Sequence, residues 1–479
     1  MFGGNVKLQS PQKDHPLLYR QVYDHIVARI QRGELAAHDK LPSIRMLAGE
    51  LQVHRLTVFR AYQLLKEEGT AYVKEKSGYY VAPVHEIMGL PTYEKSSSAA
   101  RAYQNEMSVI QRVPSVYQFS QALIDPNLLP NLYLSQYVKE VFDRYPKMIG
   151  TYSDLQGDPE LREFLSEYMT GRMKVSVTAD ELIITSGAQQ AIDLLARLYI
   201  RPLDAVMVER PTYSAALDIF RAQGARFLPV DISPGGYDLG QVEETMKRYK
   251  PRFFYMNPTF HNPTGYSVPS GQRKQLVALA EKYQCLLVED DTFRDIYFGE
   301  PPALPLFTYD TEGWVVYLSS FSKYVAPGLR ICAVVGRSSV IQPLLTLKSL
   351  ADNGSPLVNQ KLFLHYFGSE RMQNHLEKLR IALQIRRDLM IGALQDSGWQ
   401  WTVPHGGLNL WVKLPDYLSV DTLWKHATSE AVSFVPGAVF DPKGEMRSWI
   451  RLSYSFVNEE QIRTGMRLLT DLAGRLDGR

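Results

Sequence analysis

Ser320-Phe321-Ser322-Lys323, followed seven residues later by Arg330, is the stretch of this 479-residue sequence that decides the fold. Its hydroxyls and its guanidinium are groups that bind a phosphate, and its lysine amine can attack a carbonyl carbon. A ligand that carries both a phosphate and an aldehyde would use all of them. Taken alone, the stretch fits the end of a strand with a surface lysine equally well, so its interpretation depends on the rest of the chain.

Two upstream segments add a second phosphate-binding element and an aromatic ring. Ser186-Gly187-Ala188-Gln189 lies between an apolar run and a helical stretch, which predicts a strand, a glycine turn and a helix N-terminus. Free backbone N–H groups and the helix dipole favour a phosphate at such a position. Pro211-Thr212-Tyr213 follows another apolar strand, although a tyrosine beside a proline in a turn is usually a packing residue.

Polar residues continue the series toward the C-terminus. Asn262 lies in the motif 257–265, Asp290 is at the end of a buried strand, and Arg451 lies in the stretch 450–454. An acidic residue at the carboxyl end of a parallel strand is an expected ligand position in an open α/β sheet. In this order, the residues from about Phe119 to the C-terminus resemble the class I aminotransferases. The resemblance implies an α/β fold of fold type I with a large and a small subdomain, and pyridoxal 5′-phosphate (PLP) as cofactor.

The resemblance also implies how the cofactor ring is held. Lys323 would carry PLP as a Schiff base, and Tyr213 would stack on the pyridine ring. Asn262 would hydrogen-bond the phenolic O3′, and Asp290 would pair with the pyridine nitrogen, which keeps the ring protonated and able to accept electrons.

The phosphate and the incoming amino acid have their own residues in this resemblance. The residues expected around the phosphate are Ser186, Gly187, Ala188, Gln189, Ser320, Ser322 and Arg330. Arg451 would clamp the α-carboxylate of an amino acid, a task that suits a planar bidentate donor. Tyr152 would reach the phosphate of the neighbouring subunit, which implies a homodimer.

One position departs from the family. Where a tyrosine is usual three residues after the ring-binding aspartate, this chain has Phe293. Either another hydroxyl supplies the missing hydrogen bond, or the internal aldimine titrates differently and turnover is slow. We favour the second interpretation, because the N-terminal segment indicates that this is not an ordinary metabolic enzyme.

That segment has the pattern of a winged helix-turn-helix. Apolar residues recur at four-residue spacing across 16–32, and Ser43 is a plausible N-cap of a second helix. A third helix is expected from about Arg55 to Glu68. Its core face would consist of Val58, Ala61, Tyr62 and Leu65. The stretches 71–74 and 79–82 predict the two strands of the wing.

These features resemble the GntR-type DNA-binding domains. Arginine can bind guanine in the major groove and an apolar side chain can contact a thymine methyl. The expected DNA-binding residues are Arg45, Arg55, Leu56, Thr57, Phe59, Arg60, Lys76 and Gly78. Many members carry arginine where this chain has Phe59, so the operator sequence stays open. The alternative is a small helical cap or oligomerisation domain; a net charge of +4 in residues 1–83, against +2 for the whole chain, argues mildly against it.

The whole chain resembles the MocR family of bacterial transcription regulators. The expected organisation is a winged helix-turn-helix domain, mostly α, at 15–83, a linker of low apolar density at 84–118, and an aminotransferase-like domain at 119–479. The implied function is PLP-dependent regulation through operator DNA and an amine or amino-acid effector, with residual half-transamination. The alternatives are an active class I aminotransferase with an accessory DNA-binding domain, and a sensor of PLP itself.

Composition limits which other classes of protein the chain could belong to. No run of about 18 apolar residues and no signal-peptide core are present, so we expect a cytoplasmic protein without a membrane partner. The two cysteines, Cys285 and Cys332, lie in apolar strands and are expected to be reduced thiols. There is no Cys/His metal pattern and no P-loop, so no metal site is expected.

Overall fold

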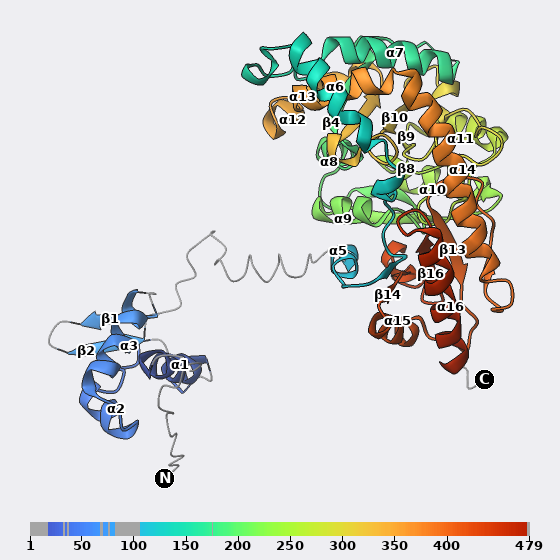
Figure 1. Ribbon diagram of the computed structural model, residues 1–479. Coiled ribbons are helices and arrows are strands. Elements are labelled where there is room, and N and C mark those ends of the chain that lie inside the picture. Colours follow the sequence, from blue (N-terminus) through green and yellow to red (C-terminus); the bar gives the residue numbers. More distant parts are fainter. Residues whose placement is uncertain are drawn as a thin grey trace. The chain divides into compact units, whose positions relative to one another are not determined.

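The computed structural model consists of two compact units, which divide the chain between Ala102 and Tyr103 (Figure 1). The residues described are 18–31, 34–35, 38–67, 70–74, 77–81, 106–174 and 176–476. Lys76, which was predicted to contact DNA, lies outside these residues. Within the described ranges, no helix is long and apolar enough to cross a membrane.

The described residues of the N-terminal unit form three helices and a hairpin. They are α1 (Leu18–Gln31), α2 (Ile44–Glu50), α3 (Arg55–Glu67), β1 (Ala71–Lys74) and β2 (Gly78–Val81). Ser43 caps α2, as predicted, by accepting a hydrogen bond of 3.2 Å from the Met46 N–H. The predicted core face of α3 is buried and consists of Val58, Ala61, Tyr62 and Leu65. Burial of this face leaves the opposite face of α3 to solvent.

A large eight-stranded sheet forms the centre of the second unit. Its strand order is β4-β11-β10-β9-β8-β5-β6-β7. The strands are β4 (Leu182–Ser186), β5 (Ala205–Arg210), β6 (Arg226–Ser233), β7 (Gly236–Tyr237), β8 (Phe253–Met256), β9 (Leu286–Asp290), β10 (Val315–Ser320) and β11 (Ile331–Val335). All run parallel except β11 and the short β7. Strands of such a sheet are apolar on both faces because helices cover both.

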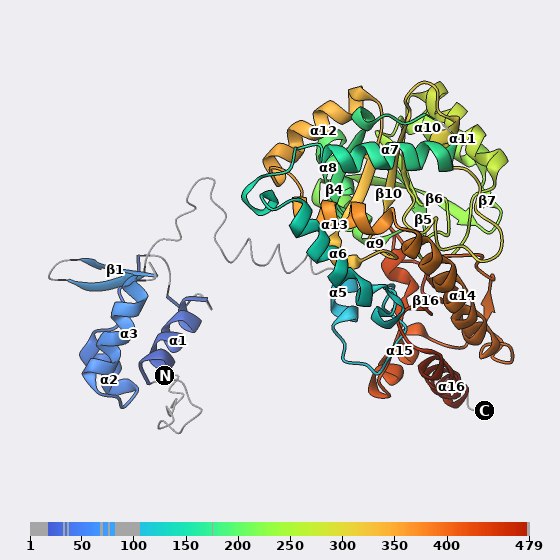
Figure 2. The same cartoon turned by 45° about the horizontal axis from the view of Figure 1, so that its top comes forward.

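Alternate strand residues pack against different helices. Val206 and Val208 face α8 (Ala188–Tyr199), α9 (Ser214–Ala222) and α12 (Ser338–Ala351). Ala205 and Met207 face α10 (Leu239–Tyr249) and α11 (Ser270–Tyr283), and the adjoining part of that face is covered by α7 (Pro159–Met173) and α13 (Leu357–Phe367). Helix α6 (Asn131–Arg144) packs on α13. The result is a three-layer α/β/α body (Figure 2).

The small subdomain is an antiparallel sheet with helices. Its sheet has the order β12 (Gln400–Trp401), β13 (Asn409–Lys413), β16 (Trp449–Ser453) and β15 (Val435–Pro436). Its helices are α14 (Glu370–Gly392), α15 (Val420–Ser429) and α16 (Glu459–Leu476). This arrangement provides the large and small subdomains expected of fold type I.

The end of the predicted linker is part of this body. Residues 106–118 were expected to belong to the linker, but they include helix α5 (Glu106–Gln111) and strand β3 (Tyr117–Gln118). Ile110 of α5 packs against Trp411 and Phe440, and β3 pairs in parallel with β14 (Val432–Ser433). Residues 106–118 therefore belong to the second unit and not to the linker. Their low apolar density gave no sign of the few contacts that they make with the C-terminal part of the chain.

Candidate cofactor site and DNA-binding surface

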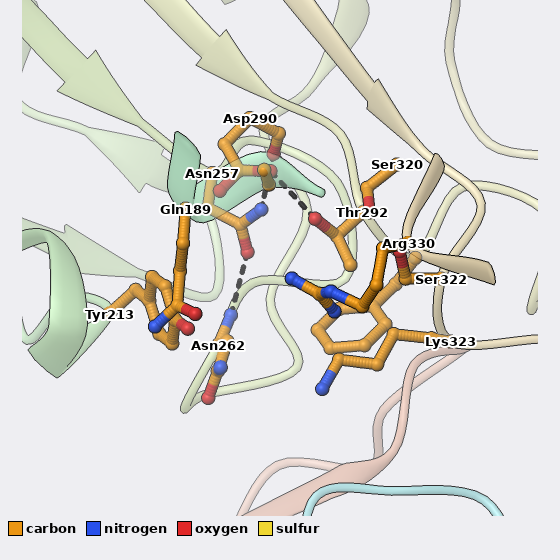
Figure 3. A pocket seen from close by; sticks show the side chains of 12 residues that line it. Gln189, Tyr213, Asn257, Asn262, Asp290, Thr292, Ser320, Ser322, Lys323 and Arg330 are labelled. Carbon is orange, nitrogen blue, oxygen red and sulfur yellow. Dashed lines mark hydrogen bonds between the residues drawn. The ribbon is translucent and has the colours of Figure 1, made fainter. Parts of the chain in front are cut away.

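A cavity of about 100 Å³ opens where the parallel strands of the large sheet end (Figure 3). It is lined by the predicted residues Ala188, Gln189, Tyr213, Asn262, Asp290, Ser320, Ser322, Lys323 and Arg330, together with Asn257, Thr292 and Phe293. The sheet brings these residues together because the carboxyl ends of its parallel strands meet at one edge.

One wall of the cavity is a cradle of hydrogen-bond donors. Helix α8 begins at Ala188, and its N-cap residue Gly187 supplies no side-chain cap, so the first N–H groups of the helix are available to a ligand. Arg330 donates from Nη2 to the Ser186 carbonyl at 3.2 Å. Gly187 has a φ of 85°, and a Cβ at this position would collide with the Arg330 guanidinium. Ser186 and Gly187 are thus placed behind Arg330, where they shape the cradle without lining the cavity.

Lys323 lies in the cavity wall with its amine beside the main chain. Its Nζ donates to the Ala122 carbonyl at 3.2 Å. Burial, together with the positive charges of Arg451 and Arg330, lowers the pKa of Lys323 to about 8. With this pKa, about a tenth of the amine is neutral and nucleophilic at pH 7, far more than for an ordinary lysine.

Asp290 lies on the opposite side, with a hydroxyl on each carboxylate oxygen. Thr292 Oγ1 donates to Oδ1 at 2.7 Å, and the Tyr255 hydroxyl donates to Oδ2 at 2.8 Å. Burial raises the pKa of Asp290 to about 6, and the two hydroxyls oppose that rise. Sequence reasoning missed both partners. Thr292 could have been found from its position two residues after the aspartate, whereas Tyr255 lies within the apolar run of β8.

The contacts of Asn262 determine which way its amide points. Its Oδ1 accepts a hydrogen bond from Asn409 Nδ2 at 3.3 Å and lies 3.5 Å from Arg451 Nη1. The amide nitrogen is therefore the group left for a ligand. Its backbone N–H donates to Asn257 Oδ1 at 2.7 Å.

Arg451 is a buried cation with unused hydrogen-bonding capacity. It is 2% exposed, and its Nη2 donates to the Ser120 carbonyl at 2.6 Å. Its Nε has no hydrogen-bond partner among the described residues. Burial lowers the pKa of this guanidinium to about 9. Such a group gains from a carboxylate, which supplies both charge and acceptors.

Two predicted features concern the edge of the site. Phe293 is 2% exposed and lines the cavity, so an apolar ring stands where the family has a hydroxyl. Tyr152 is 85% exposed and does not line the cavity of its own chain. That placement leaves it available to a neighbouring subunit, as its predicted role requires.

The side chains present fit PLP. The cradle of α8, Ser320, Ser322 and Arg330 offers donors to a phosphate dianion, and Lys323 offers a partly neutral amine to a carbonyl. Asp290 is the carboxylate of the described cavity wall, and a cationic pyridine nitrogen would compensate its burial.

The N-terminal unit exposes five of its predicted DNA-binding residues to solvent. Arg45 on α2 and Arg55 and Arg60 on α3 are exposed, and so are Leu56 (64%) and Phe59 (40%). Thr57 and Gly78 are half-buried. Met46 on α2 is also 58% exposed and was not predicted as part of this surface. In a helix-turn-helix, the recognition helix reaches the base edges with its first turns. In this chain the recognition helix is α3.

Comparison with known proteins assigns each of the two units to a protein family. The aminotransferase class I and II family matches residues 131–469, and the gntR family of bacterial regulatory proteins matches residues 18–81. A 2-aminoadipate transaminase of Thermus thermophilus is 34% identical over 76% of this chain and 91% of its own length. The uncharacterized HTH-type transcriptional regulator YisV of Bacillus subtilis is 30% identical over 98% of both chains.

A solved structure extends the similarity to three dimensions. LysN, the α-aminoadipate aminotransferase of Thermus thermophilus, complexed with N-(5′-phosphopyridoxyl)-L-leucine, has a TM-score of 0.75 and 32% identity, and the match covers 81% of this chain and all of that one.

The fold and its lysine-bearing cavity define a PLP-binding protein, and the chain belongs to the aminotransferase class I and II family. Its N-terminal unit adds a GntR-type helix-turn-helix, and the two together form the MocR-type architecture. The predicted fold class, family resemblance and cofactor are confirmed.

Proposed function

We propose that this protein is a PLP-dependent transcription regulator that binds operator DNA with its N-terminal unit and senses an amine or amino acid at Lys323. The observation that carries the proposal is that one chain combines a lysine, a carboxylate and a phosphate cradle in one cavity with a helix α3 that exposes Arg55 and Arg60. Such a protein would act in the cytoplasm, where its operator is.

Three residues in and beside the cavity have defined tasks in this proposal. Bound PLP supplies an electrophilic carbon and a ring that accepts electrons. Lys323 would hold the cofactor through its amine, at the position for which an incoming amine competes. Asp290 would hold the ring nitrogen, and Arg451 would orient the carboxylate of an amino-acid effector. The effector regulates DNA binding only if its affinity differs between two states of the protein.

A homodimer is part of the same proposal. Tyr152 and Ile149 are 85% and 71% exposed, and Val138 and Phe142 on the preceding helix α6 are also exposed. An exposed apolar surface of this kind is typical of a protein interface. Two DNA-binding units in one dimer would bind two half-sites and gain affinity from both.

The test measures binding to the intergenic DNA beside the protein's own gene, with and without PLP and candidate amines. We expect the effector to change the DNA dissociation constant of the PLP-loaded protein, and Lys323→Ala to keep DNA binding but lose the response. Lys348→Ala, which removes a buried lysine outside the cavity, is the matched control. A response that persists in Lys323→Ala would contradict the proposal.

Two further outcomes separate the alternatives. Turnover of amino acid and keto acid at ordinary enzyme rates, without any DNA response, would favour an aminotransferase; the intact set of Lys323, Asp290, Asn262 and Arg451 makes that assay necessary. A DNA response to PLP alone would favour a PLP sensor. A probe with one half-site should bind much more weakly than the full operator if the protein acts as a dimer.

A further inference from the structure

Asn257 connects two residues of the cofactor site and has no predicted role of its own. Its Oδ1 accepts the Asn262 N–H at 2.7 Å, and its Nδ2 donates to the Asp290 main-chain carbonyl (Figure 3). Both polar ends of its side chain are therefore bonded to protein. Asn257 lines the cavity, but these bonds direct its polar atoms toward Asn262 and Asp290.

Glu209 holds the main chain of Asn257 in place. This carboxylate at the end of β5 is fully buried, and its Oε2 accepts the Asn257 N–H at 2.8 Å. Its Oε1 accepts the Tyr237 hydroxyl at 2.5 Å, and His261 Nε2 lies 3.1 Å from Oε2. A buried carboxylate is tolerated only with such partners, so its position is tightly determined.

The connection crosses three strands of the sheet. Glu209 belongs to β5, Asn257 follows β8, and Asp290 ends β9, and these strands are neighbours in the order β5-β8-β9. None of the hydrogen bonds in this chain of contacts depends on a ligand. The spacing between Asn262 and Asp290 is thus fixed by the protein before any ligand binds, which is the condition for preorganised binding.

We propose that Asn257 and Glu209 are positioning residues, with Asn257 setting the distance between the two cofactor-binding residues Asn262 and Asp290, and Glu209 holding Asn257 in place. The inference rests on the proposed PLP site. It assigns neither residue a contact with the cofactor, so each acts through another side chain or through the main chain.

The test uses the full-length protein, stripped of cofactor and titrated with PLP. We expect Asn257→Ala to weaken PLP binding roughly tenfold or more, the range seen when outer-shell partners of metal ligands are removed. The pH midpoint of the visible absorbance of bound PLP should shift as well, because the contacts of Asn262 and Asp290 with the ring change. Glu209→Gln is the milder second variant, and it should shift affinity and midpoint in the same direction.

Glu289→Gln is the matched control. Glu289 is equally buried, precedes Asp290 on β9, and accepts the backbone N–H groups of Leu306 and Phe307 at 2.9 and 3.1 Å, but it does not line the cavity. It should lower the unfolding temperature of the cofactor-free protein as Glu209→Gln does, while PLP affinity and the pH midpoint stay as in the unmodified protein.

The outcomes are distinct. Native PLP affinity and midpoint in Asn257→Ala would overturn the proposal, and so would an equal loss of affinity in Glu289→Gln, since the effect would then be one of general stability. If the unmodified protein does not bind PLP at all, the proposed function itself is wrong.

Discussion

Replacing Lys323 by methionine should stabilise the cofactor-free protein, and the gain should depend on pH. Its pKa falls from 10.5 to about 8, chiefly through burial, so the native state disfavours the ammonium form. The unfolded chain binds more protons than the native one between these two values, and native stability rises with pH across that window. Below about pH 8 the whole penalty is present.

The expected size of the effect follows from the shift. At about 1.4 kcal/mol per pKa unit, the upper value is about 3 kcal/mol. Lys323 is half-buried in the cavity wall, so solvent screening reduces this value, and the variant also loses the bond to the Ala122 carbonyl, which contributes about 1 kcal/mol. A net gain of about 1–2 kcal/mol remains below pH 7, or roughly 1–3 °C in unfolding temperature for a chain of this size.

Thermal unfolding of the cofactor-free protein between pH 6 and pH 10 is the assay. The gain should shrink toward zero as the pH approaches 10. Lys348→Met is the control, because Lys348 is fully buried but bonded to Asp352 at 2.8 Å, and its removal should destabilise the protein at every pH. A Lys323→Met protein that is no more stable than the unmodified one at pH 6.5, or whose gain persists at pH 10, would refute the reasoning.

Three further predictions concern other parts of the chain. Asp290→Ala should weaken PLP retention far more than DNA binding, measured by gel filtration and by operator titration, because the DNA-binding unit is separate. Phe293→Tyr should lower the pH midpoint of the visible absorbance of bound PLP, since a hydroxyl donor stabilises an anionic O3′. If the titration curves of the variant and the unmodified protein superimpose, another residue already donates a hydrogen bond to O3′. Arg55→Ala or Arg60→Ala should cost about 1–3 kcal/mol of operator affinity and relax preference at particular base pairs, tested with single-base operator variants. A uniform loss across all sequences would instead indicate a phosphate contact.

Features that depend only on residues close together in the sequence were predicted correctly. The buried face of α3 follows from helical spacing alone, and the N-cap at Ser43 follows from residue type and position. Most residues of the cavity wall could be named because their motifs resemble those of the class I aminotransferases, and the sheet gathers these motifs at one edge.

Contacts set by strand pairing could not be predicted. The hydroxyl of Tyr255 reaches Asp290 because β8 pairs with β9, and nothing within the apolar run Phe253–Met256 distinguishes this tyrosine from a core residue. Strand β3 was assigned to the linker for the same reason, since its partner β14 lies near the other end of the chain. Asn257 was visible in its motif, but its role depends on the position of Glu209.

The main chain just after β3 has a double attachment that bears on how a signal could leave the cavity. The Ser120 carbonyl accepts from Arg451 and the Ala122 carbonyl accepts from Lys323, and these residues continue directly from α5 and the linker. A carboxylate that used Arg451 Nη2 as well as the free Nε would compete with the first attachment, and a carbonyl compound held by Lys323 would compete with the second. Ligands at both residues would therefore act directly on the segment that continues from α5, which is how occupancy of the site would reach the chain leading toward the DNA-binding unit.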